Sequence, residues 1–187
     1  PHVSYVIPEE LQWTPETKAL MEDDTFEFLW QNGKFDVQFF WRKGIRLRVD
    51  HDLMLLSYAL DENKGLHDLE QISNDAVRAP NWKGMLEEYL PNRNTSYEVI
   101  PKPILYKYLG KDVSATLQSF HVLWEKVKND RHLRKAYERV LIPGSDFLAQ
   151  VEYNGIKVDL EQNTRNDIRL QAELEGIQAK LDSITGL

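Results

Sequence analysis

The 187-residue sequence contains no cysteine, which excludes a disulfide framework and any cysteine-ligated zinc site. It has no apolar run near the roughly 18 residues that a membrane-spanning helix requires, so no membrane partner is expected. Basic residues are in the minority, with 23 Lys and Arg against 30 Asp and Glu and a formal net charge of −7. This balance argues against a passive nucleic-acid binder, which is usually basic. It is compatible with an enzyme whose carboxylates are neutralised by bound cations.

Apolar residues make up 42% of the chain and include five tryptophans. That content supports a packed core, and the length of 187 residues is enough for one α/β domain with an additional helical piece. The sequence begins at Pro1 rather than at methionine, so we expect a processed or trimmed part of a longer chain. The absence of cysteine and of an opening signal peptide fits a reducing compartment.

Residues 25–40 change their hydrophobic period part-way along. Alternation over residues 26–30 predicts a short, half-buried strand, and the Asn32-Gly33 dipeptide predicts a turn. Phenylalanines then recur at helical spacing, at Phe35, Phe39 and Phe40. Asp36 would lie in the first turn of that helix, where the helix dipole favours a carboxylate. Taken alone, Asp36 therefore has an ordinary structural explanation.

The rest of the pattern predicts two more strands and several helices. Alternating residues indicate strands at 3–7 and 45–49. Cap signals and apolar stripes indicate helices at 14–22, 34–43, 53–60, 101–123, 130–154 and 160–183. Asp50 or Asp52 should cap the helix at 53–60, and Pro143 should kink or interrupt the helix at 130–154. Residues 75–100 should form an ordered loop with one helical turn.

Tyr108 and Asp112 lie four residues apart on a predicted helix, so they share a face. A tyrosine packed on the core with an aspartate at its rim would explain this pair without a functional role. The histidines are weaker candidates for metal ligands, because His67, His121 and His132 have no partner at the spacing of helical metal ligands.

In combination, these segments resemble the 3′–5′ proofreading exonuclease domain of family A DNA polymerases, of the bacterial polymerase I and phage type. One motif of that family, Asn-x-x-x-Asp on a strand-turn-helix, matches residues 32–36, and another, Tyr-x-x-x-Asp on a late helix, matches residues 108–112. The intervening family segments are similar to residues 50–60 and 66–69. The junction with the polymerase domain is similar to residues 137–143 and 151–159. The similarity covers nearly the whole chain in the family's order, which makes it more specific than any single motif.

The resemblance implies an α/β fold of the ribonuclease H-like class, with a mixed sheet flanked by helices and a C-terminal helical extension. Residues 1–142 would form the exonuclease-like domain without its first strand. Residues 143–187 would form the junction and the first helix of the polymerase domain. In that last helix, apolar residues follow spacings of four, three, four and three, which is typical of a seam that needs a partner helix: Leu170, Leu174, Ile177, Leu181 and Ile184.

The resemblance also implies a reaction, the hydrolysis of phosphodiester bonds at a single-stranded DNA 3′ end with two Mg²⁺ or Mn²⁺ ions. Asp36 and Asp112 would be the metal carboxylates, and Tyr108 would orient the attacking water. The residues expected beside the terminal nucleotide are Gln31, Asn32 and Phe35. The expected partners are that DNA end and the remainder of the polymerase chain, in the cytoplasm of a bacterium or a phage-infected cell.

The sequence departs from the family at its first motif, an Asp-x-Glu on the first strand. Glu9-Glu10 and Asp23-Asp24 lie outside apolar strands and do not replace it. With two of four site carboxylates missing, the 187-residue chain is expected to have little exonuclease activity. An inactive scaffold or single-strand guide domain therefore stays open as an alternative, as does an RNase D-like exoribonuclease. The segment at residues 154–159, which resembles the start of the polymerase domain, favours the polymerase reading.

Overall fold

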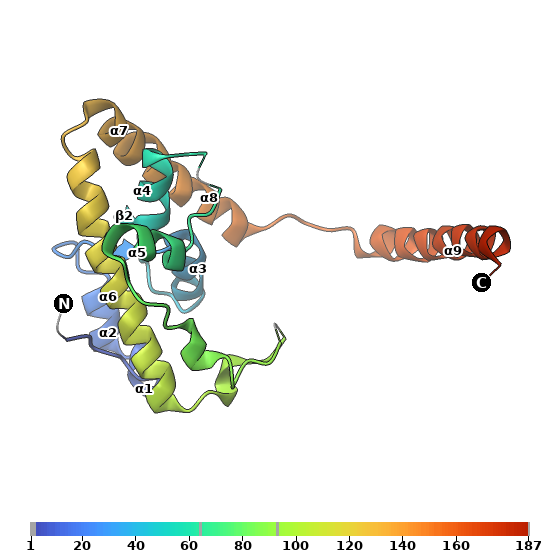
Figure 1. Ribbon diagram of the computed structural model, residues 1–187, viewed down its shortest axis with the longest axis horizontal. Coiled ribbons are helices and arrows are strands. Elements are labelled where there is room, and N and C mark those ends of the chain that lie inside the picture. Colours follow the sequence, from blue (N-terminus) through green and yellow to red (C-terminus); the bar gives the residue numbers. More distant parts are fainter. Residues whose placement is uncertain (1–2, 64, 93, 187) are drawn as a thin grey trace. The chain divides into compact units, whose positions relative to one another are not determined.

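A computed structural model describes residues 3–63, 65–92 and 94–186 of the chain (Figure 1). The chain forms two compact units, Pro1–Tyr153 and Asn154–Leu187. In chain order the elements are α1 (Glu9–Gln12), α2 (Pro15–Met21), β1 (Leu29–Trp30), α3 (Gly33–Arg42), β2 (His51–Asp52), α4 (Leu53–Leu60), α5 (Leu69–Val77), η1 (Lys83–Leu86), η2 (Tyr97–Val99), α6 (Lys102–Val127), α7 (Arg131–Ala136), η3 (Tyr137–Leu141), α8 (Ile142–Asn154) and α9 (Leu160–Thr185). Of the η elements, η1 and η2 are 3₁₀-helices and η3 is a π-helix.

The sheet differs from the predicted mixed sheet. Within the described residues it consists of β1 and β2 alone, paired in parallel with Leu29 opposite His51 and Trp30 opposite Asp52. Residues 3–7 and 45–49, both predicted as strands, join no ladder. An extended segment becomes a strand only when a neighbouring strand accepts and donates its backbone hydrogen bonds, and these two segments have no such neighbour in the part of the chain that the structure describes.

The alternation at residues 45–49 nevertheless has the predicted cause. Ile45, Leu47 and Val49 are 2–3% exposed, because they fill the core between α3 and α8. The hydrophobic pattern thus located the buried face of the segment correctly, while the hydrogen-bonding state of its backbone was predicted wrongly.

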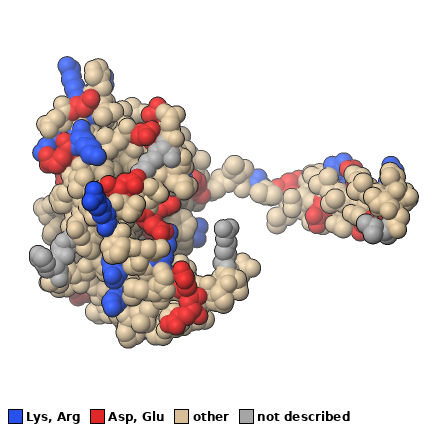
Figure 2. Space-filling view, viewed as in Figure 1, with Lys and Arg blue, Asp and Glu red and all other residues tan. Residues whose placement is uncertain are grey.

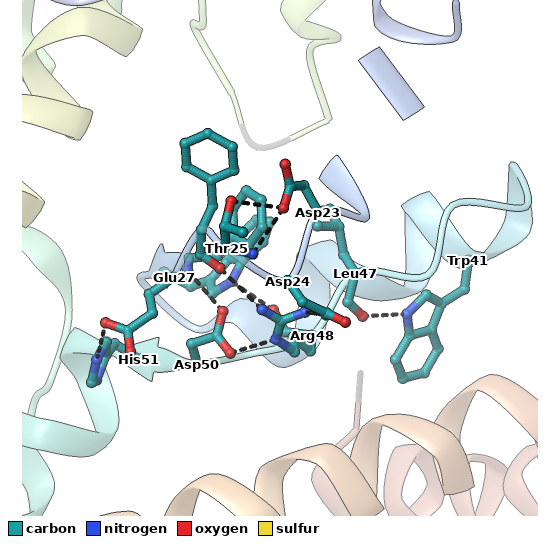
Figure 3. A network of polar contacts seen from close by, with 12 residues as sticks. Asp23, Asp24, Thr25, Glu27, Trp41, Leu47, Arg48, Asp50 and His51 are labelled. Carbon is teal, nitrogen blue, oxygen red and sulfur yellow. Dashed lines mark hydrogen bonds and ion pairs between the residues drawn. The ribbon is translucent and has the colours of Figure 1, made fainter. Parts of the chain in front are cut away.

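A charged network holds this extended segment against the chain that leads into β1 (Figure 3). The Arg48 guanidinium donates to Asp50 Oδ1 at 2.7 Å and to the Phe26 carbonyl at 3.0 Å, and it also pairs with Asp24. The other carboxylate oxygen of Asp50 accepts from the Phe28 backbone N–H at 2.8 Å. These contacts set residues 26–28 beside residues 48–50, and the short β1–β2 ladder continues from there.

Two apolar clusters stabilise the first unit. In one, α5 packs along α6 with α4 and η3 beside them (Figure 1). Its buried members are Leu53, Leu56, Ile72, Phe120, Leu123, Val127 and Tyr137. The other joins α3 and α8 through residues 45–49, and its buried members are Val37, Trp41, Ile45, Leu47, Val49 and Ala149. Together the clusters fix α3 and α6, the helices that carry the two sequence motifs.

The interruption predicted at Pro143 is confirmed. α7 continues into the π-helix η3, which ends two residues before Pro143. Proline lacks a backbone N–H, and its ring would clash with the carbonyl of the residue four positions earlier, here Arg139. Widening the preceding turn relieves that clash and lets the helix resume as α8.

The second unit contains α9, whose first turn is capped by Asp159, with Oδ1 accepting from the Gln162 N–H at 2.9 Å. No described residue of α9 is buried. The predicted seam is exposed, from 50% at Leu170 and Leu181 to 81% at Ile184. Among the helices of the described residues, none combines the length and apolarity needed to cross a membrane.

Candidate active site

The two motifs meet in one cleft of about 640 Å³, called the main cleft below. Asp36 enters it from α3, and Tyr108 and Asp112 enter it from α6. Gln31, at the end of β1, also lines it. Residues more than 70 positions apart in the sequence are thus brought to one cavity by the packing of α3 and α6 around the short sheet.

The start of α3 is held by a carboxylate from the neighbouring strand. Asn32, the N-cap residue, has a left-handed backbone (φ 61°) and makes no side-chain cap of its own. Instead, Asp52 accepts from the backbone N–H groups of Asn32 at 3.3 Å and Gly33 at 2.7 Å. Gly33 has no room for a side chain, because a Cβ there would lie 2.5 Å from the Trp30 Cβ. The direction in which Asp36 points therefore depends on Asp52 and on Gly33.

Asp52 serves two helices at once. Its Oδ1 also accepts from the N–H groups of Met54 at 2.8 Å and Leu55 at 3.2 Å, so it is the residue that caps α4, whereas Asp50 is committed to Arg48. The hydroxyl of the fully buried Tyr137 accepts from the Asp52 backbone N–H at 2.9 Å. Burial raises the pKa of the Asp52 carboxyl, and the four backbone donors offset part of that rise.

Asp36 is half-buried, and its surroundings disfavour its charge. Loss of solvent raises the pKa of its carboxyl, and the nearby Asp52 charge raises it further. A carboxylate in that position gains from a cation, because a positive charge would offset both effects.

Asp112 is held by a residue that the motif does not contain. The Trp82 indole Nε1–H donates to Asp112 Oδ1 at 2.6 Å, and Trp82 is 7% exposed. Burial raises the pKa of the Asp112 carboxyl, while the Trp82 and Tyr108 hydrogen bonds and the Lys83 charge act in the opposite direction. Burial and the neighbouring Asp112 charge raise the pKa of the Tyr108 hydroxyl, so Tyr108 is a neutral donor at neutral pH.

The main cleft also holds an ion pair that the sequence did not reveal. Lys83 Nζ lies 2.9 Å from Glu70 Oε2, and both residues line the cleft. The hydrogen bond to Glu70 raises the pKa of the Lys83 ammonium, and the charges of Asp68 and Asp112 add to this effect. A lysine therefore stands as a fixed positive charge among the carboxylates of the cleft.

Two predicted nucleotide contacts lie outside the main cleft. Asn32 lines a neighbouring cavity of about 540 Å³, the side cleft, and is not among the residues that line the main cleft. Phe35 is 58% exposed and packs edge-to-face on Phe39 at 5.1 Å on the outer side of α3. The structure therefore brings Asp36, Tyr108 and Asp112 together in the main cleft, whereas the predicted nucleotide contacts of Asn32 and Phe35 stay predictions.

Gln31 and Leu69 line both clefts and so mark where the two cavities meet. The Gln31 Nε2 donates to the His67 carbonyl at 2.9 Å, while its buried Oε1 has no partner among the described residues. The His67 Nδ1 is 3.0 Å from the hydroxyl of Ser57. The hydrogen bond to His67 holds the Gln31 side chain at the junction of the two clefts, with its Oε1 buried.

The donor chemistry of the main cleft suits hard divalent cations, since its acidic residues are Asp36, Glu70 and Asp112. Yet the described residues contain no group of three or more His, Cys, Asp or Glu arranged to hold a metal. Glu70 is committed to Lys83, which leaves two carboxylates. Mg²⁺ is commonly held by one or two carboxylates together with substrate phosphates and water. The number and the type of ligands that Asp36 and Asp112 offer therefore suit such an ion.

Asp-x-Glu does occur in the sequence, at Asp68–Glu70 and Asp159–Glu161. Both aspartates are helix N-caps, Asp68 for α5 and Asp159 for α9. In each case the Asp side chain accepts from a backbone N–H of the first turn, which explains the pattern without a metal site. Neither occurrence lies on a strand of the described residues, so neither supplies the first family motif.

Comparison with known proteins supports the same interpretation of the site as its geometry does. A family model described as 3′–5′ exonuclease matches residues 3–128. A DNA polymerase of Escherichia phage T5 is 25% identical over 180 residues, which cover 88% of this chain and 21% of that protein. DNA polymerase I of Rhizobium leguminosarum is 29% identical over 168 residues, 90% of this chain and 16% of that protein. DNA polymerase I of Bacillus caldotenax is 25% identical over 194 residues, 97% of this chain and 20% of that protein.

The chain thus spans between 16% and 21% of the length of these relatives. The match to the exonuclease model ends inside the segment that joins α6 to α7, whereas the matches to the polymerases include most of the chain.

Proposed function

Because this chain belongs to the 3′–5′ exonuclease domain family of family A DNA polymerases, we propose that it removes nucleotides from single-stranded DNA 3′ ends during proofreading. The observation that carries this proposal is the meeting of Asp36, Tyr108 and Asp112 in the main cleft. A mispaired end of any sequence has to be accepted there, and the apolar lining of the cleft, from Leu29, Leu69 and Leu117, suits contacts that do not read the base.

Divalent cations, Mg²⁺ or Mn²⁺, would supply the charge that activates water and stabilises the transition state at phosphorus. Asp36 and Asp112 are the residues proposed to hold them. Tyr108, a neutral donor beside Asp112, would orient the attacking water. Trp82 would keep the Asp112 carboxylate in one orientation through its 2.6 Å hydrogen bond.

Two further residues are given roles by their positions. Lys83 would lie close to the phosphate of the bound end, because its ammonium is a positively charged group of the main cleft. Gln31 would lie beside the terminal nucleotide, because it lines the main cleft. Asn32 and Phe35, which lie outside the main cleft, would reach the nucleotide only through the side cleft or after a side-chain rearrangement.

The family also supplies expectations for the surroundings of this site. We propose a ribonuclease H-like arrangement in which further strands extend the β1–β2 pair. We propose that residues 143–187 lead into a polymerase domain, and that the remainder of a polymerase chain is the partner of both units. The exposed seam of α9, including Leu174 at 61% exposure, would pack against that remainder.

A release assay with a 3′-labelled single-stranded oligonucleotide tests this function. With two carboxylates in place of the family's four, the 187-residue chain should release nucleotides slowly at most, in the presence of Mg²⁺ or Mn²⁺. That release should disappear in Asp36→Ala and Asp112→Ala. Asp167→Ala, an exposed position on α9, is the control. Robust metal-dependent release that survives Asp36→Ala would refute the assignment of the site.

The same assay separates the two alternatives. If no nucleotide is released while the oligonucleotide still binds in the main cleft, the domain acts as a single-strand guide. The pairing of Glu70 with Lys83 is the observation that favours this alternative. An RNA oligonucleotide of the same sequence forms the parallel arm, and preferential release from RNA would favour an exoribonuclease.

A further inference from the structure

Positive charge is concentrated in one segment of an otherwise acidic chain. Residues 126–139 contain six of the 23 Lys and Arg residues and only two of the 30 Asp and Glu residues. Lys and Arg side chains are visible at the end of the first unit that carries α7 (Figure 2). The chain therefore has a locally basic surface although its net charge is −7.

The basic side chains enclose a small cavity. Arg131, Arg134, Lys135, Glu138 and Arg139 line a cleft of about 270 Å³, the basic cleft, along α7 and η3. Arg131, Lys135 and Arg139 follow one another at intervals of four residues, which places them in a row along one side of a helix. None of these residues lines the main cleft.

Most of this charge is not neutralised by the protein. Arg134 Nε pairs with Glu138 Oε1 at 2.8 Å, and its guanidinium lies 6.0 Å from the centre of the Trp124 ring. Within the described part of the chain, no carboxylate forms an ion pair with Arg131, Lys135 or Arg139. Unpaired cations in a row, beside an arginine that is already held in place, suit a ligand that carries several phosphates.

We propose that the basic cleft binds the phosphate backbone of DNA at a place separate from the main cleft. Four residues of α-helix rise by about 6 Å, so Arg131, Lys135 and Arg139 can contact successive phosphates of one strand. The contacts would be independent of sequence, because phosphates carry no base information. The surface would hold the DNA while its 3′ end occupies or leaves the main cleft.

Binding of a fluorescent 20-nucleotide single strand, measured in EDTA at several salt concentrations, tests the proposal without hydrolysis. The triple variant Arg131→Gln, Lys135→Gln and Arg139→Gln should bind about tenfold more weakly at low salt. Its dependence of log affinity on log salt should also be shallower by about 2, since each lost phosphate contact removes roughly 0.7 from the slope on single strands. The control is Arg165→Gln, Arg169→Gln and Lys180→Gln on α9, which changes the net charge equally.

Equal affinity and slope for the triple variant and its control would overturn the proposal. Displacement of the oligonucleotide by inorganic phosphate at constant ionic strength would also overturn it, because the surface would then take single phosphate groups rather than a strand. Lys135→Glu alone gives a second test at an exposed position, with weaker binding expected. Because EDTA removes the cations, failure of the main-cleft chemistry leaves this result unaffected, and the two proposals fail separately.

Discussion

Trp82 donates its indole N–H to the carboxylate of Asp112 across 2.6 Å, from a loop 30 positions earlier in the chain. The contact gives a half-buried carboxylate a fixed donor where solvent has been lost. It also explains why a tryptophan in an irregular segment is 7% exposed. The geometry of the second motif thus depends on a residue outside the motif.

Trp82→Phe should destabilise the first unit and disturb the main cleft. Phenylalanine keeps an aromatic ring, smaller than the indole, but has no donor, so Asp112 loses its hydrogen bond. A hydrogen bond to a charged group contributes about 1.5–3 kcal/mol, and urea unfolding should show a loss of that order. Trp13→Phe is the control, since Trp13 is 42% exposed and its indole nitrogen makes no hydrogen bond with a described residue. Equal losses in the two variants would contradict the role given to Trp82.

Asp146→Asn should stabilise the protein at neutral pH. Burial raises the pKa of the Asp146 carboxyl, the Asp50 charge raises it further, and the Val49 backbone hydrogen bond offsets only part of the rise. A raised folded-state pKa contributes stability that is complete below about pH 4 and is lost as the pH rises through the folded value. Asparagine removes that loss, so the gain in free energy of unfolding should be largest near pH 7 and vanish towards pH 4.

Asp130→Asn is the control for this pH dependence. Backbone hydrogen bonds from Leu133 and His132 lower the pKa of Asp130, so its charge stabilises the folded state above about pH 4. The substitution should give no gain at pH 7. A gain at Asp130, or none at Asp146, would contradict the electrostatic account.

The sequence predicted the helices and the two motifs well, because both depend on local spacing. The helix at residues 160–183 appears as α9 (Leu160–Thr185), and Asp36 and Asp112 lie in one cleft. The sheet was predicted poorly, since alternation identifies a buried face but not the partner that a strand needs. Residues 3–7 illustrate this, being extended without a ladder.

Other site residues escaped prediction because their roles depend on long-range contacts. Asp52 was expected to cap its own helix, which it does, but its bonds to Asn32 and Gly33 come from the parallel pairing of β1 and β2. Trp82 reaches the main cleft from the loop before η1, and Lys83 reaches it as the first residue of η1. No spacing rule connects them to residues 108–112, and a run of aromatic and basic residues in a loop was the only signal.

Gly33→Ala should destabilise the protein and lower exonuclease activity together. A Cβ at this position would lie 2.5 Å from Cβ and Cγ of Trp30, so the start of α3 must move and Asp36 with it. Overpacking of this kind costs about 1–3 kcal/mol. Gly144→Ala in α8, where a Cβ meets nothing within 4 Å, should be neutral or stabilising. Thermal unfolding of both variants checks the pair, and a tolerated Gly33→Ala would contradict the packing described for α3.

Tyr137→Phe should cost about 1–3 kcal/mol, because it leaves the buried N–H of Asp52 without an acceptor. Since Asp52 holds the start of α3, activity in the main cleft should fall as well. Tyr153→Phe is the control, as the Tyr153 hydroxyl makes, among the described residues, a single long contact of 3.5 Å with the Trp41 carbonyl. Urea unfolding that ranks Tyr153→Phe as the costlier change would contradict this assignment.

The joint action of Asp36 and Asp112 is tested most directly by a double-mutant cycle on Mn²⁺ binding, followed by electron paramagnetic resonance with a non-hydrolysable single strand bound. If both carboxylates hold cations in one cleft, Asp36→Asn and Asp112→Asn should each weaken binding at least tenfold. The double variant should then bind Mn²⁺ almost as well as the single variant with the lower affinity, because the two losses of binding energy are coupled. Asp167→Asn should bind as the unchanged protein does. Losses that add in full, or unchanged binding in either single variant, would contradict a shared metal site.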